Sequence, residues 1–186
     1  MIGVLVSGSG TNLQALIDAG LPIVAVASNK PGVRALERAA AAGIETAVFP
    51  LEAHADRETR DRAMADWLAV RGVTLVVCAG YMHILTPAFL DRFPGAVVNV
   101  HPSLLPAFPG MQAIEEALAA GVARTGVTVH LVDEGVDSGP VLAQEEVPVL
   151  PGDTPESLRA RVHAVEHRLL PAVVRTLAGR RLGLTA

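Results

Sequence analysis

The feature that most constrains the fold of this chain is the alternation of short apolar runs with segments of helical period. Each junction carries glycine, proline, asparagine or serine. This alternation is typical of a parallel α/β sheet, in which each helix returns the chain to begin the next strand. The predicted strands are apolar on both faces, so we expect helices to cover both faces of the sheet. The strands are Ile2–Ser7, Ile23–Ser28, Thr46–Phe49, Thr74–Ala79 and Ala96–Val100, and the helices between them are Asn12–Ala19, Val33–Ala42, Asp56–Val70 and Pro87–Arg92.

The pattern changes after Val100. The segment His101–Gly110 contains three prolines and is predicted to be a rigid loop. A helix over Met111–Ala120 follows, then two extended segments, Gly126–Val132 and Val141–Val147, whose spacing favours an antiparallel pair. His130 is interpreted here only as a strand residue. A long helix is predicted from Thr154 towards Leu177, with a kink or an interruption at Pro171. Earlier in the chain, the charges of Asp56–Arg71 are predicted to form a solvated helix face, with Arg57 as the exception.

Composition excludes several other classes of protein. With 186 residues, the chain is predicted to form one domain, whose core can bury roughly 70% of the unfolded surface. The single cysteine, Cys78, allows no intrachain disulfide. No apolar run approaches the roughly 18 residues of a membrane span, and Met1–Gly10 lacks the basic segment of a signal peptide, so we expect a cytoplasmic protein without membrane contact. A net charge of −4 with only 3% aromatic residues disfavours nucleic-acid binding.

A glycine-rich turn, Ser7–Asn12, joins the first predicted strand to the first predicted helix. Backbone N–H groups converge at such a turn, and the helix dipole adds to their field, which favours an anion such as a phosphate. The nucleotide motifs do not match, because Leu13 stands where the dinucleotide fingerprint has its third glycine, and Ser9 follows Gly8 where a Walker loop has lysine. The turn alone leaves open a phosphate site or a tight turn with glycines for steric room.

The most informative stretch is Ala96–Pro106, where an apolar strand ends in Asn99 and His101 and continues into the proline-rich loop. Strand side chains alternate between faces, so both residues are predicted to point to one side, at the strand end where ligands gather in open α/β sheets. Asp137 lies in a second, glycine-flanked loop. An amide, an imidazole and a carboxylate form an oxyanion site without a nucleophile, which suits direct acyl transfer to an amine. A structural role for Asn99 and His101 stays open on these residues alone.

Three segments in order carry a resemblance to a known family: Ser7–Asn12, Asn99–Pro106 and Gly135–Pro140. Their sequences, SGSGTN, NVHPSLLP and GVDSGP, resemble those of the folate-dependent formyltransferases. The second segment is specific to that superfamily. The first narrows the resemblance to the glycinamide ribonucleotide formyltransferases of purine synthesis or to their hydrolase relatives. The resemblance spans nearly the whole chain and outweighs the plainer interpretations of these segments.

The resemblance implies transfer of a formyl group from the cosubstrate 10-formyltetrahydrofolate to the amine of glycinamide ribonucleotide, with no metal and no covalent intermediate. It implies that the acceptor is bound by Gly10, Thr11 and Asn12 at its phosphate and by Glu166 at its ribose. It implies a folate site formed by Arg57, Met82, His83, Ile84, Leu85 and Asn99. The implied catalytic residues are Asn99 and a protonated His101, which stabilise the tetrahedral oxyanion, and Asp137, which orients His101 and assists proton transfer between the two nitrogens.

The resemblance also implies the fold: a Rossmann-like α/β domain with a mostly parallel seven-stranded sheet, one late antiparallel strand and helices on both faces. We expect it over residues 1–186, with the acceptor phosphate bound in the N-terminal half and the folate site and catalytic loop in the C-terminal half. The Leu105–Pro106 bond is expected to be cis. Two departures from the family pattern are His83, where an arginine is familiar, and Gln112, where a histidine is frequent. The expected partners are the two small substrates, and the expected assembly is a monomer or a homodimer.

Other interpretations remain. A formyltetrahydrofolate hydrolase shares the site but has an additional N-terminal domain, which we expect to be absent because the first strand begins at Ile2. A non-catalytic nucleotide- or folate-binding module is the alternative from another class. The spacing His163-x-x-Glu166-His167 matches a zinc motif that would need a third ligand from upstream. A hydrolase triad of Ser103, His101 and Asp137 lacks the usual nucleophile elbow.

Overall fold

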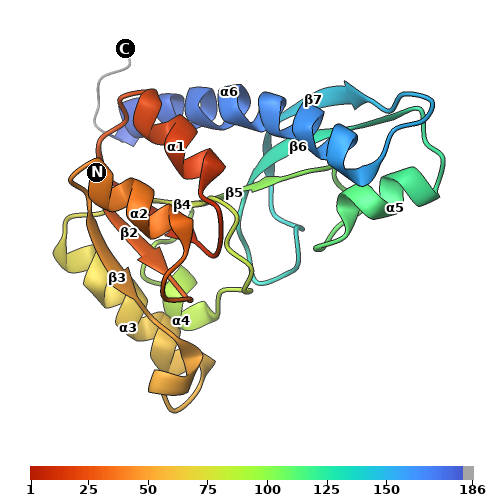
Figure 1. Cartoon of the computed structure of the whole chain (residues 1–186). Coiled ribbons are helices and arrows are strands. Elements are labelled where there is room, and N and C mark those ends of the chain that lie inside the picture. The colour runs from red at the N-terminus through yellow and green to blue at the C-terminus, as the bar shows by residue number, and fades with distance from the viewer. Residues whose placement is uncertain (182–186) are drawn as a thin grey trace.

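The computed structural model describes residues 1–181 and contains a seven-stranded sheet with helices on both faces (Figure 1). The predicted order of strands and helices is confirmed, with small differences at the ends of elements. The elements are β1 (Ile2–Val6), α1 (Thr11–Asp18), β2 (Ile23–Ser28), α2 (Arg34–Ala41), β3 (Glu45–Val48), the short 3-10 helix η1 (Leu51–Ala53), α3 (Arg57–Val70), β4 (Leu75–Cys78), α4 (Pro87–Leu90), β5 (Val97–His101), α5 (Ala113–Ala119), β6 (Arg124–Leu131), β7 (Val141–Pro148) and α6 (Pro155–Arg181).

The sheet has the strand order β3-β2-β1-β4-β5-β6-β7. Strands β1 to β5 pair in parallel, whereas β6 is antiparallel to both β5 and β7. The expected single late antiparallel strand is therefore β6. Because β6 is antiparallel to β5, the connection between β6 and β7 leaves the sheet beside Val97 and Val98, at the amino end of β5. This connection then turns back, so that Asp137 reaches the side chains of Asn99 and His101.

The alternation of side chains along the central strands divides the core into two layers. In β1, Val4 and Val6 pack against α1, α2 and α6, whereas Leu5 packs against α3 and α4 on the other face. All three side chains are fully buried. Burial of one such side chain contributes about 1.5–3 kcal/mol. The two layers therefore fix the sheet in place, and the polar residues at its carboxyl edge are held by buried strands.

Two of the expectations about these elements are wrong. Strand β3 is largely exposed, because it lies at the edge of the sheet and has a neighbour on one side only. Helix α6 is one continuous helix (Figure 1), so the interruption, one of the two outcomes expected at Pro171, does not occur. Proline within a helix costs about 3 kcal/mol, but α6 buries Leu158 and Val162 before the proline and Val174 after it, and this packing holds the helix together.

The expected solvated face of α3 is also incorrect in one place. Arg60 and Asp61 are fully buried, and Arg60 donates from Nε and Nη2 to Oδ1 of Asp61 at 2.9 and 2.6 Å. Charged residues are buried only when they are paired, and here each residue supplies the other's partner. Among residues 1–181, no helix is long and apolar enough to cross a membrane.

Candidate active site

The turn between β1 and α1 leaves the first backbone N–H groups of the helix without a capping side chain. Gly10 has a φ of 72°, and a Cβ atom placed on it would lie 2.6 Å from Cβ and 2.7 Å from Cα of Ala35. Glycine is therefore required here both for backbone conformation and for space. Helix α1 begins at Thr11, and no side chain caps its first turn. The first N–H groups of the helix, together with its dipole, are thus free to bind an anion.

Asn12 and Glu166 meet in the interior beside this turn. Nδ2 of Asn12 donates to Oε2 of Glu166 at 2.9 Å, which joins α1 to α6. Burial raises the pKa of Glu166 to about 7, even though the hydrogen bond from Asn12 acts to lower it. Oδ1 of Asn12 is buried and has no partner among the described residues. An unpaired buried oxygen is costly, so this position suits a ligand or a water that donates to it.

The carboxyl end of β5 carries the predicted pair Asn99 and His101. Both point away from the layer that holds Val98 and Val100, as the strand alternation predicts. His101 is buried, and its Nε2 lies 2.8 Å from the carbonyl oxygen of Phe108, which can only accept a hydrogen bond. The Leu105–Pro106 bond in the intervening loop is cis, as expected. The loop thus folds back to place its own carbonyl on the imidazole.

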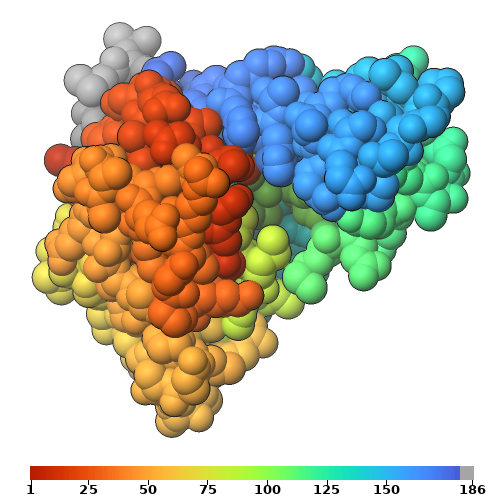
Figure 2. Space-filling model, in the orientation of Figure 1, coloured from red at the N-terminus to blue at the C-terminus, as the bar shows by residue number. Residues whose placement is uncertain are grey.

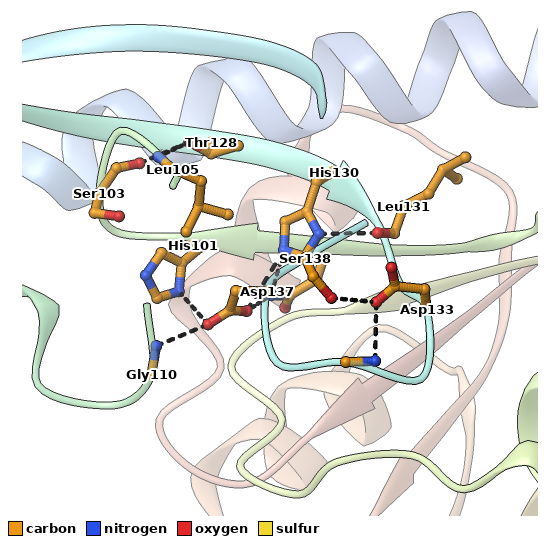
Figure 3. A network of polar contacts seen from close by, with 12 residues as sticks. His101, Ser103, Leu105, Gly110, Thr128, His130, Leu131, Asp133, Asp137 and Ser138 are labelled. Carbon is orange, nitrogen blue, oxygen red and sulfur yellow. Dashed lines mark hydrogen bonds and ion pairs between the residues drawn. The ribbon is translucent and has the colours of Figure 1, made fainter. Parts of the chain in front are cut away.

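Asp137 lies in the loop between β6 and β7 and faces His101 (Figure 3), and it also contacts Asn99. Oδ2 of Asp137 lies 3.3 Å from Nδ1 of His101 and accepts a hydrogen bond of 2.9 Å from the N–H of Gly110. Asn99 Nδ2 lies 3.4 Å from the other carboxylate oxygen. Asp137 has a φ of 52°, and aspartate is one of the few residues other than glycine that tolerate this conformation.

The electrostatics of the site favour an ionised Asp137. Burial acts to raise the pKa of Asp137, but the contact with His130, the N–H of Gly110 and the charge of His101 together hold it below its usual value. Both ring nitrogens of His101 face oxygen atoms, one of Phe108 and one of Asp137. This arrangement suits an imidazolium, which donates from both nitrogens.

Sequence reasoning missed the part that His130 plays. Nε2 of His130 lies 3.1 Å from Nδ2 of Asn99 and 3.6 Å from Oδ1 of Asp137, and its Nδ1 lies 2.9 Å from the carbonyl of Leu131 (Figure 3). The available signal was the alternation in β6, because Val127 and Val129 face the apolar layer and a histidine on the opposite face is adjacent in sequence to the Asp137 loop.

A cavity of ≈ 590 Å³ brings most of the predicted residues together. Those that line it are Arg57, Met82, His83, Ile84, Leu85, Asn99, His101 and Asp137, joined by His130. They come from both halves of the chain, and Figure 2 shows that the molecule is hollowed between its N-terminal part, in red and orange, and its C-terminal part, in green and blue.

The predicted acceptor residues Gly10, Asn12 and Glu166 do not line this cavity, and Thr11 lines a second cleft of ≈ 580 Å³ between α1 and α6. The cavity and the glycine-rich turn are connected by a hydrogen bond of 2.9 Å from the N–H of Met82 to Oγ of Ser7.

Two of the alternative interpretations gain no support from the geometry. Ser103 is fully buried and donates its hydroxyl to the carbonyl of Ala107 at 2.5 Å, so it faces away from any substrate in the cavity. Among residues 1–181, no three histidine, cysteine, aspartate or glutamate side chains lie close enough together to hold a metal ion. Nε2 of His163 lies 3.9 Å from Oε2 of Glu166, and its ring stacks on that of His167. No further metal-ligating side chain of the described residues completes a site with these histidines.

Comparison with known proteins places this geometry in a family. A family model described as formyl transferase matches residues 1–174. The chain belongs to the formyl transferase family. It is 47% identical over 180 residues to the phosphoribosylglycinamide formyltransferase of Mycobacterium tuberculosis, covering 94% of this chain and 83% of that protein. It is also 46% identical over 185 residues to the trifunctional purine biosynthetic protein adenosine-3 of Chironomus tentans, and the match covers 95% of this chain but only 14% of that protein.

Solved structures of the family have the same fold. Glycinamide ribonucleotide transformylase 1 from Symbiobacterium toebii superposes with a TM-score of 0.95 at 46% identity, over 97% of this chain and 88% of that one. The phosphoribosylglycinamide formyltransferase from Streptococcus pneumoniae superposes with a TM-score of 0.92 at 40% identity, over 95% and 97% of the two chains. The likeness therefore extends over most of the length of both solved chains.

Proposed function

We propose that this chain transfers the formyl group of 10-formyltetrahydrofolate to the amine of glycinamide ribonucleotide. The observation that carries the proposal is the convergence of Asn99, His101 and Asp137 on one cavity at the carboxyl edge of the sheet. The set contains hydrogen-bond donors and a base but no accessible nucleophile, which matches direct attack of an amine on a formyl carbon. The names of the similar proteins support the same reaction.

The acceptor is bound at the turn and at the buried pair beside it. The first N–H groups of α1, at Thr11 and Asn12, hold its phosphate together with the backbone of Gly10. Glu166 and the unpaired Oδ1 of Asn12 lie where a ribose hydroxyl can be bound, since both are acceptors in an interior position. The acceptor then extends from the turn to the cavity, past Ser7 and Met82, which are hydrogen-bonded to each other.

The folate is bound in the cavity against Arg57 and the run Met82–Leu85, with its formyl group beside Asn99. The attacking amine forms a C–N bond to the formyl carbon, and the carbonyl electrons move to the oxygen. Asn99 and the His101 imidazolium donate to that oxyanion, and His101 does so by releasing one of its present acceptors, the carbonyl of Phe108 or the carboxylate of Asp137. The tetrahedral intermediate collapses by breaking the bond to N10 of the folate. The proton lost by the amine reaches that nitrogen with the assistance of Asp137, so tetrahydrofolate and the formylated amide are released.

Two alternatives use the same cavity. In a hydrolase, water replaces the amine as attacking group and the turn remains empty during turnover. In a binding module, the ligands bind without reaction. The buried Asn12–Glu166 pair favours the transferase, because a hydrolase that attacks with water needs no acceptor site beside the cavity.

The substitution His101→Ala tests the enzyme against the binding module. Loss of an oxyanion donor lowers kcat by roughly 10²–10³-fold. We expect the variant to bind both substrates with dissociation constants close to those of the wild type, measured by calorimetry, and to lose formyl transfer. His54 is half-buried, stacks on Phe49 and is not among the residues that line the cavity, so His54→Ala is the matched control and should retain full activity. Equal activity of His101→Ala and wild type would contradict the assignment.

A further inference from the structure

Residues 80–86 form one wall of the cavity and have no regular secondary structure. The segment is held in place by side chains of other elements. Besides the bond from Met82 to Ser7, α3 supplies three contacts to it. Arg57 Nη2 donates to the carbonyl of Ile84 at 2.6 Å, Asp61 Oδ2 accepts from the N–H of Thr86 at 2.8 Å, and Arg60 Nη1 lies 2.9 Å from Nδ1 of His83. Apart from the contact with Ser7, the wall is therefore positioned by one face of α3.

Stability alone is a poor explanation for the buried pair in this arrangement. Removing two charges from water costs several kcal/mol per ion, and buried ion pairs are often no more stabilising than apolar residues of similar size. The hydrogen bonds of Arg60 and Asp61 outside the pair go to His83 and Thr86, both on the cavity wall. The cavity wall therefore supplies the remaining hydrogen-bond partners of the buried pair, and these hydrogen bonds hold the wall in position.

The contact with Arg60 also decides the tautomer of His83. A guanidinium carries only donors and stays protonated, so Nδ1 of His83 must accept and the ring proton must be on Nε2. The groups that face His83 are the cations Arg60, Arg57 and Lys30, the carboxylate Asp61 and the ring of Tyr81. Burial, and then the three cations, lower the pKa of His83. Among the described residues, Nε2 of His83 has no hydrogen-bond partner, and the side chain lines the cavity.

We propose that the buried Arg60–Asp61 pair is a positioning element of the folate site, which holds His83 as a neutral imidazole so that its Nε2–H donates to a carbonyl or carboxylate oxygen of the bound folate. The inference rests on the proposed function for the identity of the ligand, but the tautomer and its cause do not depend on it. Arg60 and Asp61 touch no substrate and act through His83 and Thr86.

The experiment compares Arg60→Met with Arg62→Met, an exposed arginine of the same helix paired only with Glu58. In the wild type, ¹⁵N NMR of His83 should show an unprotonated Nδ1 and a protonated Nε2 from pH 6 to 8. In Arg60→Met the two tautomers should exchange. The KM for 10-formyltetrahydrofolate should rise roughly 5- to 20-fold, the loss of about one hydrogen bond, with kcat and the KM for glycinamide ribonucleotide within about twofold. Arg62→Met should match the wild type in every measurement.

Other outcomes would overturn the proposal. An Nδ1-protonated His83 in the wild type, or an unchanged folate KM in Arg60→Met, contradicts it, and so does a parallel change in kcat and both KM values, which indicates a structural role only. If Arg60→Met does not fold, His83→Phe replaces it, since the ring volume is kept and the donor is lost; an unchanged folate KM there contradicts the proposal. If the wild type shows no formyl transfer, the proposed function fails separately, and the NMR result and the calorimetric Kd for tetrahydrofolate decide the positioning role.

Discussion

At the scale of single residues, Asp137 is the carboxylate around which the site is assembled. It faces His101, His130, Asn99 and the N–H of Gly110, and these contacts hold it ionised against the effect of burial. The carboxylate lies 3.3 Å from Nδ1 of His101 and so fixes the orientation of the imidazole ring. The negative charge of the site is thus carried by Asp137, which need not contact the formyl group itself.

Glu166 should make the stability of the protein depend on pH. Its pKa is about 7 in the folded protein and has an ordinary value of 4.5, so the folded state binds the proton more tightly. The contribution of this proton to the free energy of unfolding is therefore complete below the ordinary pKa of Glu166 and is lost as pH rises through its folded-state pKa of about 7. Between pH 5 and 8 this loss amounts to about 2–3 kcal/mol.

The substitution Glu166→Gln removes this titration and keeps the shape of the side chain. Denaturant unfolding should show that the free energy of unfolding of the variant minus that of the wild type is about 2–3 kcal/mol larger at pH 8 than at pH 5, because only the wild type loses stability over this range. The pKa values of His163 and His167 are lowered mainly by burial. His167 is common to both proteins, whereas Nε2 of His163 lies 3.9 Å from Oε2 of Glu166, so the two proteins are compared in a His163→Gln background. The same relative stability at both pH values would show that Glu166 is not protonated in the folded state.

At the scale of elements, the turn before α1 is the place where backbone conformation and packing both require glycine. Gly10 combines a positive φ with the close approach of Ala35, whereas Gly20 at the end of the same helix has a φ of 67° and open space around its Cβ position. The two glycines therefore separate the conformational cost from the steric cost.

Gly10→Ala should cost about 2–4 kcal/mol, the sum of the left-handed conformation and overpacking against α2. Gly20→Ala should cost about 1 kcal/mol, since only the left-handed conformation contributes there. Chemical denaturation measures both. A displaced turn should also raise the KM for glycinamide ribonucleotide in the first variant and leave it unchanged in the second. Equal costs for the two substitutions would contradict the packing argument.

Elements were predictable where local patterns decide, and less so where contacts between distant elements decide. The buried strands and the pair Asn99 and His101 follow from period-two alternation and from the position of a strand end. The alternation in β6 indicates only which face of the sheet His130 is on. Its position opposite Asn99 depends on the register of β6 against β5, which the sequence of β6 alone does not predict. The burial of Arg60 and Asp61 depends on the cavity wall, which reaches α3 from more than twenty residues away along the chain.

At the scale of the whole molecule, the two halves of the chain contribute to both of the proposed substrate sites. The turn of β1 and α1 is joined to α6 through Asn12 and Glu166, and the cavity lies between segments before and after β5. The sheet is what brings these segments together, because β1, β4 and β5 are adjacent and parallel and end at one edge. This arrangement accounts for a reaction in which two substrates meet at the carboxyl end of the sheet.

The measurement that tests the central claim most directly is formyl transfer from 10-formyltetrahydrofolate, followed by the absorbance of the released tetrahydrofolate, with and without glycinamide ribonucleotide. We predict turnover only when the acceptor is present, with one formylated acceptor formed for each tetrahydrofolate released. Equal release without the acceptor would identify a hydrolase. No release in either case would contradict the proposed reaction and leave a protein that binds these ligands without transforming them.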